Sequence, residues 1–365
     1  MVGGDNNLNR KESHINHLNV DTKKSMLSRI IISICLVIIV VPCIFFGDYI
    51  FLCLIFLASV IATHEIIKTP QSIERKFNNL IYVFAYIMSF LLIYWIFIKN
   101  NLASYFNNPD AYSFSLYNNF ESPFISLSAF VISVAFLFIM IFIDKTFTVQ
   151  DAFYFVSMLF IVSIGFQSIM FLRFFPSTEL YNEYLDLLNS TNALDIARVE
   201  EIKAQLDSST FKYLHSTGLL FYMLIGVCLN DVGAYFIGVL FGKHKLIPRI
   251  SPKKTWEGFV GGIVVSISTS MLFAFLMAYF GYPILNILDL DHWYNIVILS
   301  LIMPIVGTFG DLLFSSIKRY YNIKDFGQAL KSHGGVLDRL DSILISSIAL
   351  GLFIPLMEHT WLIYL

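Results

Sequence analysis

Long apolar stretches dominate the pattern of hydrophobic and polar positions along the chain. A transmembrane helix needs about 20 consecutive, mostly apolar residues. Nine stretches have roughly this length, and they lie near residues 27–46, 49–67, 80–98, 123–143, 152–174, 216–241, 258–281, 293–316 and 342–364. The pattern therefore predicts an all-α, polytopic integral membrane protein with about nine transmembrane helices.

Polar segments divide the chain into four regions. Residues 1–25 are polar and Asn-rich and lack the apolar core of a secretory signal, so we expect a disordered cytosolic tail. Residues 26–174 hold five of the nine stretches and form an N-terminal transmembrane region. The longest polar insert, 175–215, is acidic and expected outside the cytosol, and 216–365 combines four stretches with polar loops in a second transmembrane domain.

Lysine and arginine gather in alternate loops. The tail before the first stretch is basic, and so are the loops after the second, sixth and eighth stretches. The insert 175–215 and the loop with Asp289 and Asp291 are acidic. Since loops rich in Lys and Arg stay in the cytosol, this alternation predicts an N-in, C-out topology. We expect the inner membrane in a bacterium, or an endoplasmic reticulum or organelle membrane in a eukaryote, with the basic loops facing the cytosol.

Composition excludes a soluble protein built around one core. The chain is 57% hydrophobic and 14% charged, whereas soluble domains carry about 25% charged residues. The four cysteines lie in or beside apolar runs without any CxxC pair, so we expect small membrane residues rather than a disulfide framework or zinc site. The net charge is −2, and no nucleic-acid partner is expected.

The densest group of charged residues lies at the end of the eighth stretch and in the loop after it. Residues 310–342 contain four carboxylates, five cations and a His-Gly-Gly sequence. Asp311 and Ser315 are four residues apart and share one face of a helix. Asp311 stands in an apolar run, where an unpaired carboxylate costs at least about 2.5 kcal/mol. A metal ion or a basic partner would offset that cost.

The same group has the side chains that a magnesium–phosphate site needs. Mg²⁺ takes one or two protein carboxylates together with substrate phosphates. Asp311 and Asp338 fit as metal ligands because they lie at neighbouring helix ends, and Asp325 and Asp341 are supporting or alternative ligands. The backbone N–H groups of a Gly-Gly sequence can approach phosphate oxygens closely. The alternative is an ordinary cytosolic loop with incidental acids.

A second polar group lies in the sixth stretch and the loop after it. Asp231 is deep in the apolar run, either as a helix-packing partner of a lysine or as part of a polar cavity. Ser251 as N-cap and Pro252 at the first helical position predict a helix start. A helix N-terminus with Lys253 and Lys254 beside it suits a polyphosphate.

Together the two groups resemble the phosphatidate cytidylyltransferase (CDP-diacylglycerol synthase) family over residues 216–365. The positions that match its signature are Ser315, Lys318, Arg319, Lys324, Asp325, His333, Gly334, Gly335, Asp338, Arg339 and Asp341. Asn-Asp-x-Gly-Ala-Tyr from Asn230 and Ser-Pro-Lys-Lys-Thr-Trp-Glu-Gly from Ser251 resemble its other conserved block. Lys331 and Ser332 depart from the family's Pro-Gly. The first half lacks a catalytic motif, and we expect its His64 and Glu65 to be interfacial.

The resemblance implies an enzyme that joins CTP and phosphatidate into CDP-diacylglycerol and pyrophosphate. It implies Mg²⁺, with a monovalent cation such as K⁺ as a further candidate, and a homodimer among membrane lipids. The implied catalytic residues are Asp311, Asp338, Lys318, Arg319, Lys324, Asp325, His333, Arg339 and Asp341. The implied substrate-binding residues are Asp231, Lys243, Ser251, Lys253, Lys254, Ser315, Gly334 and Gly335.

Two other functions compete with this interpretation. A CTP-dependent polyprenol or phytol kinase would transfer the γ-phosphoryl group instead of the cytidylyl group. A transporter would use Asp231 and Asp311 as ion sites within the membrane. Transporters often contain internal repeats, and we find no such repeat. The polar residues also gather at the expected cytosolic face of the membrane, which favours an enzyme whose active site faces the cytosol.

Overall fold

The structure is a computed structural model that describes most of the two transmembrane regions. The described residues are 35–46, 48–71, 76–107, 123–189, 199–200, 202–203, 216–329 and 334–357. The predicted tail 1–25 and the predicted site residue His333 lie outside them, as do Lys331 and Ser332.

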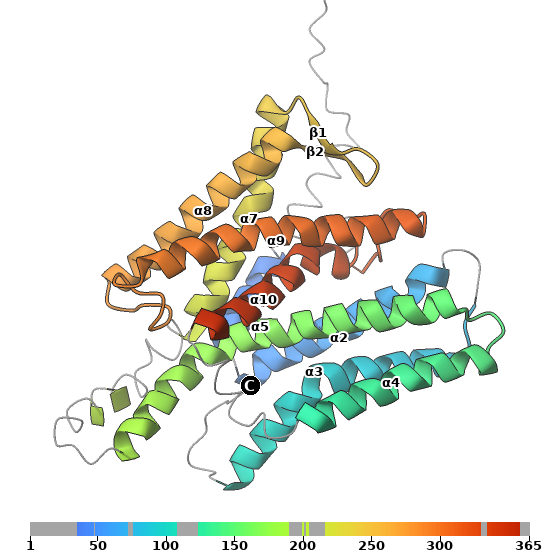
Figure 1. Ribbon diagram of the computed structural model, residues 1–365, viewed down its shortest axis with the longest axis horizontal. Helices are drawn as coiled ribbons and strands as arrows, with labels where there is room; N and C mark the ends of the chain where they lie inside the picture. Colours follow the sequence, from blue (N-terminus) through green and yellow to red (C-terminus); the bar gives the residue numbers. More distant parts are fainter. Residues whose placement is uncertain are drawn as a thin grey trace, which may run out of the picture.

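Helices account for nearly all of the described secondary structure (Figure 1). They are Cys35–Phe46, α2 (Asp48–Gln71), α3 (Asn79–Asn107), α4 (Pro123–Ile143), α5 (Val149–Asn189), α7 (Ser216–Phe241), α8 (Trp256–Tyr279), α9 (Trp293–Tyr320) and α10 (Leu337–Met357). Each of the nine predicted stretches overlaps one of these helices. Among the described residues, six helices are long and apolar enough to cross a membrane. The count of nine spans and their direction stay predictions.

Helix α5 is longer than its apolar stretch predicts. It continues past Pro176 to Asn189, so the first part of the predicted polar insert is helical. The added sequence is rich in Leu and Glu, which favour helix. A proline inside a helix removes one backbone hydrogen bond and bends it, and α5 changes direction along its length (Figure 1).

The fold is predominantly α-helical, as predicted, but a short antiparallel hairpin corrects the predicted helix start at Ser251. Strand β1 (Lys245–Ile247) pairs with β2 (Ser251–Thr255). Ser251 therefore begins a strand, and the N-cap of α8 is Thr255, whose side chain accepts a hydrogen bond from the Gly258 N–H. The physical reason is that a residue before proline favours extended backbone, while threonine caps a helix well.

Helices α7 and α8 form a close pair that rises from the rest of the molecule, with the hairpin at its end (Figure 1). Glycines permit this approach. A Cβ on Gly262 would lie 2.7 Å from the Asn230 carbonyl oxygen, and one on Gly233 would lie 2.8 Å from Val265 Cβ. Helices α9 and α10 pack together between this pair and the group formed by α2, α3, α4 and α5.

The burial of the helices divides the molecule into a centre and a lipid-facing rim. Two thirds of the apolar span of α5 is buried (67%), against 22% for α7. Large apolar side chains near the end of α7, such as Val239 and Leu240, are exposed. Because the bilayer core offers an apolar solvent for such faces, the chain is an integral membrane protein with α5 at its centre.

Candidate active site

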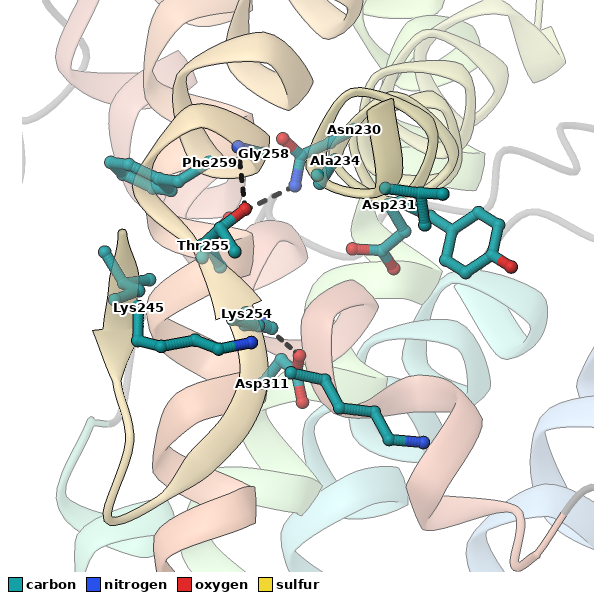
Figure 2. Close-up of a pocket in the computed structure, with 15 residues that line it drawn as sticks. Asn230, Asp231, Ala234, Lys245, Lys254, Thr255, Gly258, Phe259 and Asp311 are labelled. Carbon is teal, nitrogen blue, oxygen red and sulfur yellow. Dashed lines mark hydrogen bonds and ion pairs between the residues drawn. The ribbon is translucent and has the colours of Figure 1, made fainter. Parts of the chain in front are cut away.

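A cavity of about 500 Å³ lies between α7, the hairpin, the start of α8 and the later half of α9 (Figure 2). Five charged residues line it: Asp231 from α7, Lys245 from β1, Lys253 and Lys254 from β2, and Asp311 from α9. The remaining lining is largely apolar or small. The cavity thus brings Asp311, from the first polar group that the sequence singles out, together with Asp231, Lys253 and Lys254 from the second.

Asp311 has the basic partner that its apolar surroundings require. Lys254 Nζ forms an ion pair with Asp311 Oδ2, and the Ser315 hydroxyl donates to Asp311 Oδ1 over 3.2 Å. The predicted shared helix face of Asp311 and Ser315 is thereby confirmed. The Asp311 side chain keeps 25% of its surface exposed and that of Lys254 keeps 28%. Both groups can therefore be reached from the cavity.

Asp231 faces Asp311 across the cavity. The two side chains extend from α7 and α9 toward the same space (Figure 2). The charged groups that act on Asp231 include Asp311, Lys254 and Arg339. Two carboxylates facing each other in this way repel one another, and a cation between them would relieve the repulsion. This placement favours the cavity interpretation of Asp231 over simple helix packing.

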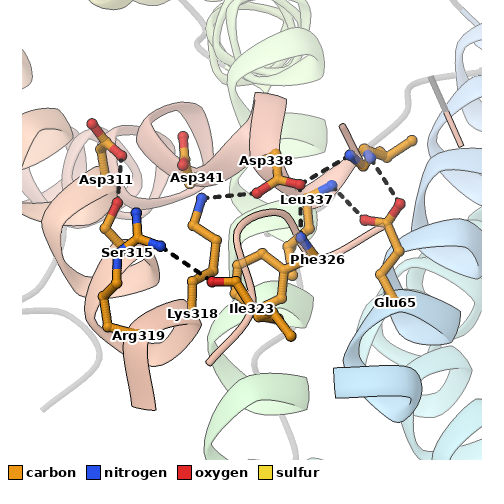
Figure 3. Close-up of polar contacts among 12 residues, drawn as sticks. Glu65, Asp311, Ser315, Lys318, Arg319, Ile323, Phe326, Leu337, Asp338 and Asp341 are labelled. Atoms are coloured by element: carbon orange, nitrogen blue, oxygen red, sulfur yellow. Dashed lines mark hydrogen bonds and ion pairs between the residues drawn. The ribbon is translucent and has the colours of Figure 1, made fainter. Parts of the chain in front are cut away.

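The Asp338 side chain is buried at the start of α10, and both of its oxygens accept hydrogen bonds (Figure 3). Its Oδ1 accepts from Lys318 Nζ over 2.8 Å, and its Oδ2 accepts from the N–H groups of Phe326 (2.8 Å) and Gly335 (2.9 Å). Its side chain is 5% exposed. Lys318 also lies over the Phe326 ring. These contacts, which we call the Asp338 cluster, fasten the loop after α9 to the start of α10.

Asp341 lies between Asp311 and Asp338 in the view of Figure 3. It is buried, its Oδ1 accepts from the Ser342 N–H over 2.8 Å, and the charges that act on it include Asp311 and Lys318. Asp341 is thus within electrostatic range of Asp311, whereas Asp338 is bonded to Lys318 and two backbone N–H groups. In the described part of the chain, no group of three or more His, Cys, Asp or Glu side chains is arranged to hold a metal ion.

The remaining basic candidates lie around the cavity rather than in its lining. Arg319 donates from Nε to the Ile250 carbonyl oxygen and from Nη1 to that of Ile323, which ties the hairpin to the end of α9. Lys324 is exposed in the loop after α9, and Lys243 is exposed at the end of α7. Arg339 acts electrostatically on Asp231 from the first turn of α10.

Four other predicted residues belong to the strand and loop that frame the site. Ser251 begins β2 and is not among the residues that line the cavity. Asp325 is exposed beside Gly334, whose φ of +82° favours glycine. A Cβ on Gly334 would lie 3.1 Å from Asp338 Oδ2. The Gly335 N–H is donated to Asp338, so in this structure it holds the helix start.

Sequence reasoning missed two polar residues of the site. Lys245 lines the cavity from β1, and its place there could be predicted only by knowing that the hairpin forms. Glu65 corrects the interfacial expectation, since it is 3% exposed and its carboxylate accepts from the Val336 and Leu337 N–H groups. No local signal could reveal that contact, because its partners lie 271 and 272 residues away. His64 is half-buried and contacts the Tyr86 hydroxyl.

Comparison with known proteins gives a consistent set of relatives. A curated phosphatidate cytidylyltransferase of Mycobacterium leprae is 42% identical over 131 residues, 36% of this chain and 38% of that protein. The one from Bacillus subtilis is 42% identical over 125 residues, 34% and 43% of the two chains. The one from Haemophilus influenzae is 38% identical over 165 residues, 44% and 54%.

These alignments span about half or less of the length of the curated relatives. A wider match comes from the family model described as cytidylyltransferase family, which covers residues 27–357. It includes both the apolar N-terminal helices and the charged residues around the cavity. The chain belongs to the cytidylyltransferase family.

Proposed function

We propose that the protein transfers the cytidylyl group of CTP to phosphatidate, giving CDP-diacylglycerol and pyrophosphate. The observation that carries the proposal is the cavity, where three lysines and two aspartates meet at the edge of a membrane bundle. The family and the printed names of the relatives support the same chemistry. CTP, phosphatidate and the surrounding lipids are therefore the proposed partners.

The lysines of the hairpin are the proposed binding groups for the CTP phosphates. Lys245, Lys253 and Lys254 reach the cavity from two paired strands, so one small element positions all three. A polyphosphate arriving there would compete with Asp311 for Lys254. Charge-assisted contacts of this kind are the stronger hydrogen bonds in proteins. Binding would also leave the Asp311 carboxylate free for a second role.

The lipid substrate has a lateral route to the same cavity. Tyr235 and Val239 line the cavity and are also 67% and 68% exposed on the rim of α7. A wall shared by the cavity and the lipid-facing surface would let a phosphatidate headgroup enter sideways while its acyl chains stay in the bilayer. The CTP would come from the cytosol in the proposed N-in, C-out orientation.

The reaction requires charge neutralisation more than a strong base. A phosphatidate oxygen, already anionic at neutral pH, attacks the α-phosphorus of CTP. A new bond forms between that oxygen and the α-phosphorus, the bond from the α-phosphorus to the α,β-bridging oxygen breaks, and pyrophosphate leaves with the electron pair. Fixed cations that face the accumulating negative charge lower the barrier of such a transfer. Lys253 and Lys254, which line the cavity, are the proposed cations for this role.

Magnesium is the proposed cofactor, and the residues present fit it. Asp311 offers a carboxylate on the cavity wall, with Asp231 opposite and Asp341 behind it. One or two such ligands suffice for Mg²⁺ when substrate phosphates complete its shell. The bound ion would supply charge neutralisation and alignment of phosphate oxygens. Asp338 would join the ligand set only by giving up donors of the Asp338 cluster; K⁺ remains a further candidate.

Radiolabelled CTP tests the proposed reaction against the kinase alternative. Purified protein in phosphatidate-containing micelles with Mg²⁺ should move label from [α-³²P]CTP into the lipid fraction and leave label from [γ-³²P]CTP in pyrophosphate. Lipid labelled only by the γ-phosphate would establish a kinase instead. Absence of any labelled lipid, with phosphatidate or polyprenol as acceptor, would overturn the enzyme proposal and favour the transporter.

A further inference from the structure

We propose that Glu65, in the N-terminal half of the chain, is a positioning residue for the active site. It holds the start of α10, and through this backbone it fixes Asp338, Arg339 and Asp341. The inference rests on the proposed function for its kinetic effect, although its structural part can be tested without turnover. It assigns a definite role to a half of the molecule that carries no catalytic motif.

The contact is a two-pronged hydrogen bond between distant parts of the chain. Glu65 Oε1 accepts from the Val336 N–H and Oε2 accepts from the Leu337 N–H, each over 2.9 Å (Figure 3). Glu65 comes from α2, and the two donors lie at the start of α10, where Leu337 is the first helical residue and Val336 precedes it. Both oxygens of one carboxylate thus fix the direction in which α10 begins.

The charge of Glu65 suits this position. A buried carboxylate among apolar helices is costly unless hydrogen-bond donors surround it. The first N–H groups of a helix lack partners within the helix, and the helix dipole places positive charge there. Glu65 and the start of α10 therefore satisfy each other.

Glycines on the opposite side show that the fit is tight. A Cβ on Gly335 would lie 2.5 Å from both Glu65 carboxylate oxygens, and one on Gly327 would also clash with Oε1. The Gly335 N–H meanwhile donates to Asp338 Oδ2. Gly335 is thus held between two carboxylates, Glu65 on one side and Asp338 on the other. A displacement of Glu65 would pass directly to the Asp338 cluster.

Residues that frame the site also rest on the N-terminal half at other points. The Tyr154 hydroxyl of α5 donates to the Ile66 carbonyl oxygen, next to Glu65 in α2. The Tyr154 ring packs edge-on against Tyr321 at the end of α9, with centroids 4.9 Å apart. Helices α2 and α5 therefore support both ends of the loop between α9 and α10. Of these contacts, the one made by Glu65 joins a charged side chain to the backbone at the start of α10.

The experiment compares Glu65→Gln and Glu65→Ala with Thr63→Val in the full-length protein. Thr63 is a matched control because it is equally buried in α2 but bonds Ser89, away from the active site. Each variant is assayed for kcat and for the KM of CTP. Hydrogen exchange of the Val336 and Leu337 amides is measured in the same detergent without substrates.

We expect kcat to fall about 10- to 100-fold in Glu65→Ala, the range typical of losing a group that orients metal ligands. The fall should be smaller in Glu65→Gln. The KM of CTP should change little. Exchange at both amides should accelerate in Glu65→Ala and stay at the wild-type level in Thr63→Val. Equal kcat losses in Glu65→Ala and Thr63→Val, or unchanged amide exchange in Glu65→Ala, would overturn the positioning role. An inactive wild type would overturn the proposed function, while the exchange result would still decide the role of Glu65.

Discussion

The cavity and the Asp338 cluster lie at the same end of α9, but they treat their carboxylates differently. Asp311 faces the cavity with a quarter of its side chain exposed, held among the described residues by Lys254 and the Ser315 hydroxyl. Asp338 is almost wholly buried, and three donors occupy its two oxygens. From the sequence alone, both are candidate metal ligands of equal standing, because each is an acid next to an apolar span.

The difference separates a binding group from a structural one. A buried charge is stable when its donors are complete, and removing one partner leaves an uncompensated charge. An accessible acid with an exchangeable lysine can instead take a cation or release that lysine to a phosphate. We therefore expect Asp311 to act on substrates, and Asp338 to act chiefly by holding the loop that surrounds them. Four substitutions would sharpen or break this contrast.

The largest effect on activity is expected from Asp311→Asn. Loss of the charge should lower kcat/KM about 10³-fold, the upper range for removal of one electrostatic group at a reacting centre. The fold should survive, because the asparagine still accepts from Ser315. Turnover and the thermal midpoint are measured together, with Asp291→Asn in the exposed loop before α9 as control. Near-normal turnover of Asp311→Asn would remove Asp311 from the mechanism.

Asp338→Asn is expected to affect stability first. Breaking a buried ion pair costs about 3–5 kcal/mol, since Lys318 is left charged and buried. The thermal midpoint should fall markedly, and activity should fall with it. Adding Lys318→Met should recover part of the lost stability by removing the unpaired cation. An Asp338→Asn protein with wild-type stability and no activity would instead favour Asp338 as a direct metal ligand.

A moderate and selective effect is expected from Lys254→Ala. Removing one phosphate contact should raise the KM of CTP about tenfold, which corresponds to roughly 1.4 kcal/mol, and leave the KM of phosphatidate less changed. Lys145→Ala, in the exposed turn between α4 and α5, is the matched control. A higher KM for phosphatidate alone would indicate that the hairpin binds the lipid phosphate rather than the CTP.

The smallest effect is expected from Thr255→Ala. The substitution removes the N-cap of α8 and should cost about 1 kcal/mol. Ser268→Ala removes a hydroxyl hydrogen bond within the same helix and serves as comparison. Thermal midpoints of the two variants should differ by a few degrees at most. A loss of activity in Thr255→Ala much larger than this stability change would place the Thr255 hydroxyl in substrate binding.

The sequence predicts the helices well because their signal is local. A run of about 20 apolar residues has few structures open to it in a bilayer, and every predicted stretch overlaps a helix. The need of Asp311 for a metal ion or a basic partner also follows from local cost, since an isolated acid in that run is unfavourable. The sequence leaves open which lysine serves, and Lys254 lies 57 residues away.

The failures of sequence reasoning are at contacts that only the folded chain creates. Ser251 and Pro252 are residue types typical of a helix start, yet they lie in strand β2 because this segment pairs with β1. Glu65 looks interfacial beside Lys68, yet it is buried and accepts hydrogen bonds from two backbone N–H groups at the start of α10. Lys245 looks like any cytosolic lysine until the hairpin directs it to the cavity. In each case a tertiary partner overrides the local pattern.

Amine-specific labelling of the protein, with and without CTP and Mg²⁺, tests most directly whether the hairpin and α9 bind the nucleotide. Mass spectrometry would follow modification of Lys245, Lys253 and Lys254, with Lys145 as internal reference. We predict that CTP protects the three cavity lysines and leaves Lys145 unchanged. Unaltered labelling of all three lysines at a CTP concentration that saturates turnover would contradict it.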